Sequence, residues 1–400
     1  MGRVEFVALM AMLVATIAFS IDAMLPALPQ ISSELSAQNP NRAQLVVGSF
    51  VMGMGVGTFF VGAISDAFGR KPVLFWGAVL FCTAAALAFW APSLETLIAA
   101  RLLQGLGASA ARIVAMAIIR DLYKGREMAK LMSFVMMVFS LVPAVAPLLG
   151  AMIINLTGWR GIFAAFLVFA AMTTLWMSLR LTEPLPKARR TGFEIRKLLS
   201  AASEVFRHPM VRLSIGVQTL CFAMLFASIS TIQPIMDDSF GKGDDFPLWF
   251  ALIALVAATG SMVNAFFVMR LGMRRLVLWA LIGQLIVTLP VLAVFLFDPS
   301  TKVGFELYFG WQVTVFFMVS LTLGNLSSLA LEPLGHIAGM AASITTGLAT
   351  VGSIVLATPI GLAFEGTPIP LLIGVVLCAA PAIYFTMCMR HLERDVGHAK

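Results

Sequence analysis

The stretch that decides the fold is GAISDAFGRKPVL, residues 62–74, which lies between two apolar runs of the chain. Each run is long enough to cross a lipid bilayer, so the connection between them is only a few residues long. This connection contains Asp66, Arg70 and Lys71. Its two glycines allow a sharp backbone turn and a close approach of helices. The stretch therefore predicts a tight, charged turn between two membrane-spanning helices, with its cations on the cytoplasmic side.

The overall composition is typical of a membrane protein. Of the 400 residues, 60% are hydrophobic and 12% are charged, and the mean hydropathy is +0.95. A soluble globular chain is about half apolar and about a quarter charged. The net charge of +7 and the isoelectric point near 9.5 would also suit a nucleic-acid-binding protein. The positions of the charges, given below, argue against a nucleic-acid partner.

Cysteine and histidine give no sign of a metal or redox site. The four cysteines lie in apolar runs without C-x-x-C spacing, and the four histidines are scattered over loops and the C-terminal tail. The first apolar run lacks a small-residue cleavage site, so we interpret it as a span and not as a signal peptide. We expect no metal, no cofactor and no catalytic residue.

Apolar runs of about 20 residues, the length that a helix needs to cross a bilayer, occur twelve times. The predicted spans are residues 5–29, 43–65, 73–91, 95–119, 130–154, 160–181, 210–235, 247–269, 275–297, 304–330, 337–363 and 368–389. The sequence predicts an all-α membrane protein with two pseudo-symmetric six-helix bundles, residues 1–182 and 210–400. Between them, residues 183–209 are predicted to be a cytoplasmic linker with a basic amphipathic helix.

Lysine and arginine are concentrated in alternate connections. If both termini are cytoplasmic, 21 of the 27 Lys and Arg residues lie in cytoplasmic segments, and two more, Arg101 and Arg112, lie inside the fourth predicted helix. The outer connections hold only Arg42, Arg160, Lys242 and Lys302. Because cytoplasmic loops carry an excess of these residues, both termini are predicted to be cytoplasmic. The same bias explains the basic isoelectric point without a nucleic acid.

Two faint internal matches indicate a duplicated six-helix unit. The run SIDAMLP, residues 20–26, matches SISTIQP, residues 228–234, at an offset of 208. The turn GRK, residues 69–71, matches GMR, residues 272–274, at an offset of 203. Nearly equal offsets are expected when one half of a transporter repeats the other. The acid Asp22 has no counterpart in the second copy.

The quoted turn resembles the signature of the major facilitator superfamily, G-x-L-x-D-R-x-G-R-[RK], between helices 2 and 3. The resemblance implies a twelve-helix secondary transporter in which Asp66, Gly69 and Arg70 form a conformational latch with Asp121 at the inner end of helix 4. Asp66 would face the N-terminus of helix 11, where a negative charge is favourable. Ala67 stands where the family has a basic residue. We therefore expect a weakened latch.

Two ionisable residues at membrane depth need an explanation, because a charge there is unfavourable. Asp22 is predicted ~10 Å from the outer end of helix 1 and Arg101 ~9 Å from that of helix 4, at 1.5 Å per residue. Opposite charges at matching depth suggest a pair across a cavity, with Asp22 as the proton-binding acid. Burial favours the protonated form of a carboxyl and a nearby guanidinium favours the ionised form, so movement of Arg101 would switch protonation. Alternatively, Asp22 caps a broken helix end before Pro26, in water.

Four further residues are assigned to a possible substrate cavity. Arg112 lies eleven residues beyond Arg101, ~16 Å along the helix, and is predicted to face the inner half of the cavity. The alternative is that its side chain snorkels toward the inner surface. The other three residues are Met24, Gln104 and Gln233.

Helices 4 and 5 each carry a further resemblance to the superfamily. The run RLLQGLGASAA, residues 101–111, resembles its helix 4 motif R-x-x-x-G-x-G-x-A, whose arginine is tied to proton coupling and falls on Arg101. The run PAVAPLLGA in helix 5 resembles the antiporter motif G-P-x-x-G-G and assigns motif positions to Pro143, Pro147 and Gly150. This implies export in exchange for protons. The alternative is an ordinary kinked helix, because prolines bend any helix.

Three runs narrow the resemblance to the Bcr/CflA subfamily of drug-resistance transporters, known for exporting bicyclomycin and amphenicol-type antibiotics. They are ALEPLGHIAG at residues 330–339, MSFVMM at 132–137 and DAMLP at 22–26. The resemblance implies that the substrates are small, largely apolar, drug-like molecules. Glu332 is interpreted as a helix-end or loop residue, with substrate contact as the alternative.

We therefore expect a monomeric, proton-coupled exporter in the bacterial inner membrane, with a small-molecule substrate, protons and the lipid bilayer as its partners. No G-x-x-x-x-G-K-[ST] motif is present, which argues against ATP-driven transport. The nearest alternative is a transporter of an endogenous metabolite with the same fold. A membrane-embedded enzyme would need clustered histidines, acids or a nucleophile in the spans, which the sequence lacks. A receptor or scaffold without transport would leave Asp22 free to change.

Overall fold

The computed structural model describes residues 1–298 and 303–398, with side chains described up to residue 390. The assignments of Lys302 to an outer connection and of residues 399–400 to the C-terminal bundle lie outside the described residues. The described chain contains helices and no strand, and it divides into two compact units, Met1–Leu198 and Leu199–Lys400. The division falls inside the predicted linker.

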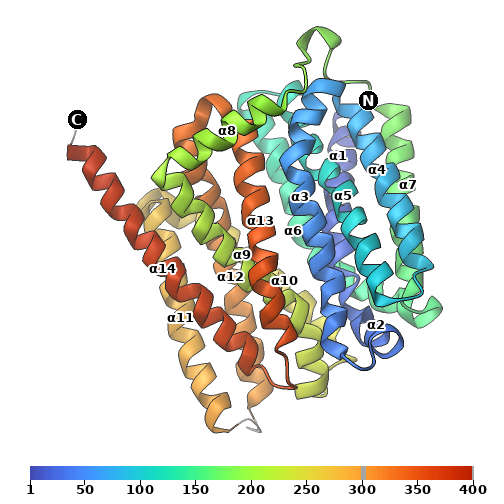
Figure 1. Ribbon diagram of the computed structural model, residues 1–400, viewed down its shortest axis with the longest axis vertical. Helices are drawn as coiled ribbons and strands as arrows, with labels where there is room; N and C mark the ends of the chain where they lie inside the picture. The colour runs from blue at the N-terminus through green and yellow to red at the C-terminus, as the bar shows by residue number, and fades with distance from the viewer. Residues whose placement is uncertain (299–302, 399–400) are drawn as a thin grey trace. The chain divides into compact units, whose positions relative to one another are not determined.

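Six long helices form each unit, which confirms the twelve predicted spans in the part of the chain that is described. Unit 1 contains α1 (Arg3–Asp22), α3 (Leu45–Phe68), α4 (Arg70–Phe89), α5 (Leu94–Leu122), α6 (Gly125–Thr157) and α7 (Arg160–Arg180) (Figure 1). Unit 2 contains α9 (Pro209–Pro234), α10 (Phe246–Leu271), α11 (Met273–Phe297), α12 (Gly304–Leu331), α13 (Ala338–Leu362) and α14 (Ile369–His398). Short helices lie between them: η1 (Leu25–Ala27), α2 (Leu28–Leu35), η2 (Pro40–Gln44), η3 (Lys187–Arg189), α8 (Ile195–Arg207), η4 (Ile235–Ser239) and η5 (Glu332–Ile337).

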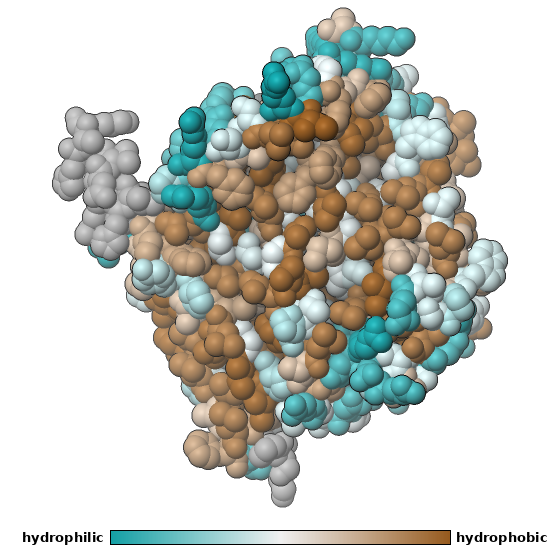
Figure 2. Space-filling model, in the orientation of Figure 1, coloured by the Kyte–Doolittle hydropathy of each residue, from teal (hydrophilic) through white to brown (hydrophobic). Residues whose placement is uncertain are grey.

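The helices have the length and surface of membrane spans. Eleven helical stretches among the described residues are long and apolar enough to cross a membrane. One of these, Gly304–Leu362, contains both α12 and α13, so it accounts for two spans. Figure 2 shows apolar side chains over most of the visible middle of the helices and hydrophilic side chains gathered at the top and at the lower right of the view. This is the distribution that a bilayer requires.

Helix α1 breaks at Asp22, where the sequence predicts one continuous span over residues 5–29. Pro26 has no backbone N–H to donate to the carbonyl of residue 22, so the regular helical hydrogen bond cannot form there. The chain instead passes through η1 and continues as α2 to Leu35. We call residues 22–24 the α1 break. The break leaves carbonyl groups of the last turn of α1 without an intrahelical donor.

Equivalent glycines form the tightest turns of the two units. Gly69 joins α3 to α4 with φ 103° and ψ 159°, and Gly272 joins α10 to α11 with φ 80° and ψ 153°. Only glycine adopts this backbone region without strain. The two positions are those matched in the sequence, and their shared conformation agrees with a duplicated unit.

Helix α5 packs between α3 and α4 through two glycines. A Cβ atom at Gly105 would overlap the carbonyl oxygen of Phe50 in α3. A Cβ atom at Gly107 would lie 2.6 Å from the carbonyl oxygen of Gly77 in α4. Two residues correspond to about 200° around an α-helix, so these glycines present opposite faces of α5. The G-x-G spacing therefore allows two backbones to approach one helix closely.

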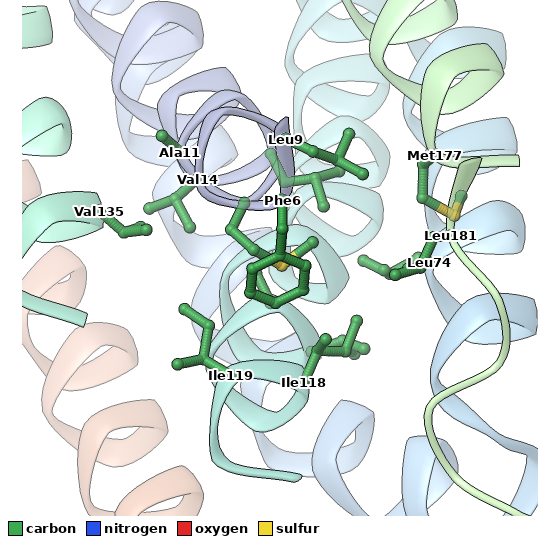
Figure 3. Close-up of a cluster of buried hydrophobic side chains, with 14 of the residues drawn as sticks. Phe6, Leu9, Ala11, Val14, Leu74, Ile118, Ile119, Val135, Met177 and Leu181 are labelled. Carbon is green, nitrogen blue, oxygen red and sulfur yellow. The ribbon is translucent and has the colours of Figure 1, made fainter. Parts of the chain in front are cut away.

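An apolar cluster joins the helix ends beside the charged turn. Phe6 of α1 lies in the middle of this cluster, with Leu74, Met177 and Leu181 together on one side (Figure 3). Ile118 and Ile119 of α5 also belong to the cluster. They lie three and two residues before Asp121, near the end of this helix. The cluster thus fixes the beginning of α4 and the end of α5 relative to each other. The charged side chains of the turn extend from these two helix ends.

Helix α8 lies within residues 183–209, where the sequence predicts an amphipathic helix. Its apolar side chains Ile195, Leu199 and Phe206 are exposed, while Val205 is buried. Exposed apolar side chains on a basic helix are the pattern of a helix that lies on a membrane surface.

Replacement of Gly105 by alanine should destabilise the protein. The added Cβ would meet the Phe50 carbonyl and the Met54 amide nitrogen, both backbone atoms that cannot rotate away. Overpacking of this kind costs about 1–3 kcal/mol. Thermal unfolding in detergent should show a lower apparent Tm for Gly105→Ala.

The matched control is Gly283→Ala in α11, because no atom lies within 4 Å of the Cβ that this substitution adds. It should unfold at or slightly above the wild-type temperature, since alanine favours helix more than glycine does. An equal decrease in Tm for both variants would show that the close α3–α5 contact is not what makes Gly105 important.

Candidate functional site

Asp22 lies at the end of α1 and is only 4% exposed. No hydrogen bond or ion pair joins its carboxyl group to another residue in the described part of the chain. Asp22 is the last residue of α1, and the C-terminal carbonyls of a helix create a negative partial charge at its end. A charged side chain buried without a partner is costly, so such a residue is a candidate functional group. The break expected for a capping residue is present, but Asp22 lies inside the protein and not in bulk water.

Arg101 of α5 is fully buried, and its guanidinium is held by three oxygen atoms. Nε donates to the carbonyl of Val46 at 3.1 Å, Nη2 donates to that of Ser20 at 2.9 Å, and Nη1 donates to Oε1 of Gln104 at 2.6 Å. The guanidinium also lies over the ring of Phe50, 4.3 Å from its centroid. Arg101 therefore connects the last turn of α1 to the first turn of α3.

The expected ion pair between Asp22 and Arg101 is absent among the described residues. Arg101 instead binds the backbone two residues before Asp22, at the Ser20 carbonyl. The reason is the break, because the last turn of a helix contains carbonyl groups that no amide of the helix can reach. Arg101 thus acts on the α1 break through the backbone, at a short distance along the chain from the acid.

Three more of the assigned residues meet at the α1 break. Met24 is completely buried within the break itself. Gln104 accepts from Arg101, while its Nε2 has no hydrogen-bond partner in the described part of the chain. Gly150 of α6 lies against the carbonyl of Ala23, where a Cβ atom would overlap the oxygen. α6 also contains the buried Pro147 and the partly exposed Pro143.

Arg112 and Gln233 are not part of this group. Arg112 lies eleven residues beyond Arg101 on α5, half-buried, with its guanidinium 5.9 Å from the ring centroid of Phe139 in α6. Gln233 belongs to α9 of unit 2, is buried, and donates from Nε2 to Oδ2 of Asp237 at 3.4 Å. Arg112 is therefore located relative to residues of unit 1 only, and Gln233 relative to residues of unit 2 only.

A charged cluster surrounds the turn at Gly69. Nη1 of the buried Arg70 lies 2.6 Å from Oδ1 of Asp66, and Nε lies 2.8 Å from Oδ2 of Asp121. Nη1 also donates to Oγ of Ser65 at 2.6 Å. The pair between Arg70 and Asp121 predicted from the sequence is confirmed. One guanidinium thus joins the end of α3, the beginning of α4 and the end of α5.

Glu183 completes this turn, in a role that the residue pattern alone does not indicate. Its carboxylate accepts hydrogen bonds from the backbone amides of Arg70, Lys71 and Leu185 at 2.9, 3.0 and 2.9 Å. The amide of Thr191 donates to the carbonyl of Asp66 at 3.2 Å. Residues 183–191, which we call the strap, therefore close over the turn. The available signal was an acid directly after a span, since carboxylates stabilise helix N-termini.

Comparisons with known sequences give a family. A sequence profile of the Major Facilitator Superfamily matches residues 8–357. The chain is 28% identical to the "Uncharacterized MFS-type transporter YdgK" of Bacillus subtilis, over 92% of this chain and 91% of that protein. It is 23% identical to the "Bicyclomycin resistance protein homolog" of Haemophilus influenzae, over 94% of each. It is 28% identical to "Multidrug resistance protein MdtL" of Shewanella oneidensis, over 65% of each.

Solved structures share the fold. The chain matches the crystal structure of a D-xylose–proton symporter with a TM-score of 0.75, at 15% identity over 94% of this chain and 97% of that one. It matches the partially occluded, inward-open xylose transporter XylE of Escherichia coli with a TM-score of 0.71, at 13% identity over 96% and 97%.

Arg101→Lys should destabilise unit 1 although it preserves the charge. An ammonium group is a single point on a flexible stem and cannot reproduce the planar fork that binds Val46, Ser20 and Gln104 together. Loss of a buried hydrogen bond to a charged group costs roughly 1.5–3 kcal/mol. The apparent Tm in detergent should decrease by several degrees.

Arg112→Lys is the control, because the Arg112 guanidinium makes no hydrogen bond to another described residue. Its Tm should remain close to that of the wild type. If the two variants unfold at the same temperature, the hydrogen bonds of Arg101 do not stabilise the α1 break.

Glu183→Ala should uncap α4. The amides of Arg70 and Lys71 would lose their acceptor, at a cost of about 1–3 kcal/mol. Hydrogen–deuterium exchange should show faster exchange of the peptide containing these two amides. Glu194→Ala is the control, since the Glu194 carboxylate pairs with the exposed Lys197 and not with an amide of α4 in the described part of the chain. Unchanged exchange in Glu183→Ala would contradict the assigned cap.

Proposed function

The chain belongs to the major facilitator superfamily, and from this premise we propose that it exports small, largely apolar, drug-like molecules across the bacterial inner membrane in exchange for protons. Transport would follow an alternating-access cycle, as in secondary transporters built from two repeated bundles. The protein would act as a monomer with both termini in the cytoplasm. The observation that carries the proposal is the buried, unpartnered Asp22 at the α1 break.

Two lines of support favour drug efflux. Relatives that match most or about two thirds of the chain carry the names bicyclomycin resistance protein homolog and multidrug resistance protein. The sequence of α6 also resembles the antiporter motif, with Ala146 and Ala151 in place of glycines, and its Gly150 lies against the α1 break. A placement in the Bcr/CflA subfamily agrees with both.

Proton coupling would act through the charge of Asp22. Its carboxyl group has no described partner, so binding or release of a proton changes the net charge inside an apolar part of unit 1. The nearest fixed cation along the backbone path is Arg101, held on the Ser20 carbonyl. A change of charge would alter the attraction between residue 22 and this guanidinium, and with it the position of the α1 break against α6.

Substrate would be bound beside this break. Met24 would offer an adaptable apolar side chain, and the unpartnered Nε2 of Gln104 would offer two N–H donors, once a change of conformation exposes these buried residues. This combination suits a mainly apolar molecule with few polar groups. Arg112 and Gln233 are proposed to line other parts of the same path.

The charged cluster would stabilise one conformation of the cycle. Asp66, Arg70 and Asp121 hold three helix ends together, and Glu183 adds the strap. Ala67 contributes no charge, which favours a weaker latch than the family signature implies. The concentration of Lys and Arg in alternate connections supports a cytoplasmic position for this cluster.

Asp22→Asn should abolish proton-driven efflux. The amide is similar in size but cannot bind and release a proton, so the coupling step is lost while the fold is kept. In proteoliposomes with an imposed pH gradient, uptake of several cationic and neutral dyes should decrease to the background of empty liposomes. Exchange of dye for dye without a gradient should continue.

Asp244→Asn provides the control, because Asp244 is exposed in the connection between η4 and α10. It should transport like the wild type. Gradient-driven transport by Asp22→Asn at the wild-type rate would remove the coupling assignment. If the wild type moves none of the dyes, transport of an endogenous metabolite becomes the better hypothesis.

A further inference from the structure

A surface groove with a volume of about 380 Å³ lies beside the charged turn, between α4, α7 and the strap. Its polar lining is formed by Lys71, Ser178, Glu183 and Arg190. Phe75 and Trp76 form its apolar side. The latch and the α1 break do not use this groove, and every lining residue belongs to unit 1.

The groove carries two cations without a carboxylate partner among the described residues. Nζ of Lys71 donates to the carbonyl of Ser178 at 2.8 Å, which leaves two of its three protons available. Nε of Arg190 makes a long hydrogen bond to the carbonyl of Leu185 at 3.4 Å. Glu183 forms no ion pair with either cation, and its carboxylate is held by three backbone amides. It still carries one negative charge, so Lys71, Arg190 and Glu183 together give the lining a net charge of +1. The polar end of the groove therefore suits an anion.

The other end of the groove opens onto apolar surface. Trp76 is 67% exposed and Phe75 is 41% exposed, with their rings 5.6 Å apart. Trp76 lies five residues into α4 from Lys71, ~8 Å along the helix, the depth at which tryptophan collects at membrane interfaces. Beyond it, Leu80 of α4 and Leu175 of the adjacent α7 are also exposed. A molecule bound here would meet cations first and an apolar seam next.

We propose that this groove binds an anionic phospholipid of the surrounding leaflet. The lipid phosphate would lie between Lys71 and Arg190, and an acyl chain would follow the seam between α4 and α7 past Trp76. Basic pockets between helices at the membrane surface suit acidic headgroups, whereas a zwitterionic headgroup brings its own cation to the site. A free phosphate would gain only the polar half of these contacts, so the seam selects a lipid.

The bound lipid would also hold the strap in place. Arg190 reaches Gly69, where a Cβ atom would lie 2.7 Å from Nη2. A phosphate that binds both Arg190 and Lys71 connects the strap to the first turn of α4. The proposal does not depend on the transported substrate or on proton coupling.

Native mass spectrometry of the delipidated, full-length protein tests the site with phosphatidylglycerol as the probe. The double variant Lys71→Gln/Arg190→Gln should bind it roughly 25-fold more weakly, because each basic residue near an anionic headgroup contributes about a fivefold change in affinity. The charge-preserving Lys71→Arg/Arg190→Lys should bind like the wild type. Equal binding by the Gln variant and the wild type would overturn the proposal.

Lys124→Gln/Arg126→Gln is the matched control, because both cations are exposed near the same end of unit 1 and lie outside the groove. It should retain phosphatidylglycerol. Phosphatidylcholine with the same acyl chains should bind weakly, and millimolar glycerophosphate should not displace the lipid. An equal loss in the control, equal binding of phosphatidylcholine, or displacement by glycerophosphate would each contradict a specific lipid site.

Fluorescence quenching tests the apolar half independently. Phosphatidylglycerol with brominated acyl chains should quench part of the emission of the seven tryptophans. That part should become smaller in Trp76→Phe, which keeps an aromatic ring at the same place, while the exposed Trp90 and Trp279 remain. Quenching that is unchanged in Trp76→Phe would show that the lipid chain does not pass this residue.

Discussion

The break in α1 imposes the constraint on which the rest of unit 1 depends. A helix that ends inside an apolar bundle exposes backbone carbonyls that neither water nor its own amides can satisfy. The guanidinium of Arg101 meets this need at the Ser20 carbonyl and, with another of its nitrogens, binds the backbone of α3. The buried charge and the broken helix therefore stabilise each other. The ionisable acid at position 22 then follows, two residues later in the chain, the carbonyl that holds this guanidinium.

Much of this arrangement could be predicted from residue patterns, because it depends on local rules. Apolar run length predicts the spans, and Gly69 and Gly272 predict turns that only glycine forms. The pairing of Arg70 with Asp121 follows from two charges at the same end of neighbouring helices. The partners of Arg101 could not be predicted in this way. They are backbone carbonyls, which every residue carries, and which of them lacks a donor depends on where Pro26 ends α1. The role of Glu183 could not be predicted for a related reason, because two of the three amides that it binds, those of Arg70 and Lys71, lie more than 110 residues earlier in the chain.

The two units contain the same glycine turn, but the residues around it differ in charge. The backbone conformation at Gly69 recurs at Gly272, whereas Met269 occupies the position that corresponds to Asp66. The shape of the turn is set by glycine, and its electrostatics are set by the neighbouring residues. Only the first copy therefore combines a glycine turn with an arginine between two acids. The ion pairs of Arg70 therefore lie in the unit that also carries Asp22 and Arg101.

The acceptor of the Arg70 amide lies 113 residues later in the chain, at Glu183. All six spans of the first bundle must therefore be synthesised before Glu183 can bind the turn between the second and third spans, α3 and α4. Until then the amides at the start of α4 depend on water at the membrane surface. The hydrogen bonds from these amides to Glu183 can therefore form only after the strap has been synthesised. A nascent chain arrested before residue 183 would hold every span of this bundle and still lack the group that closes it.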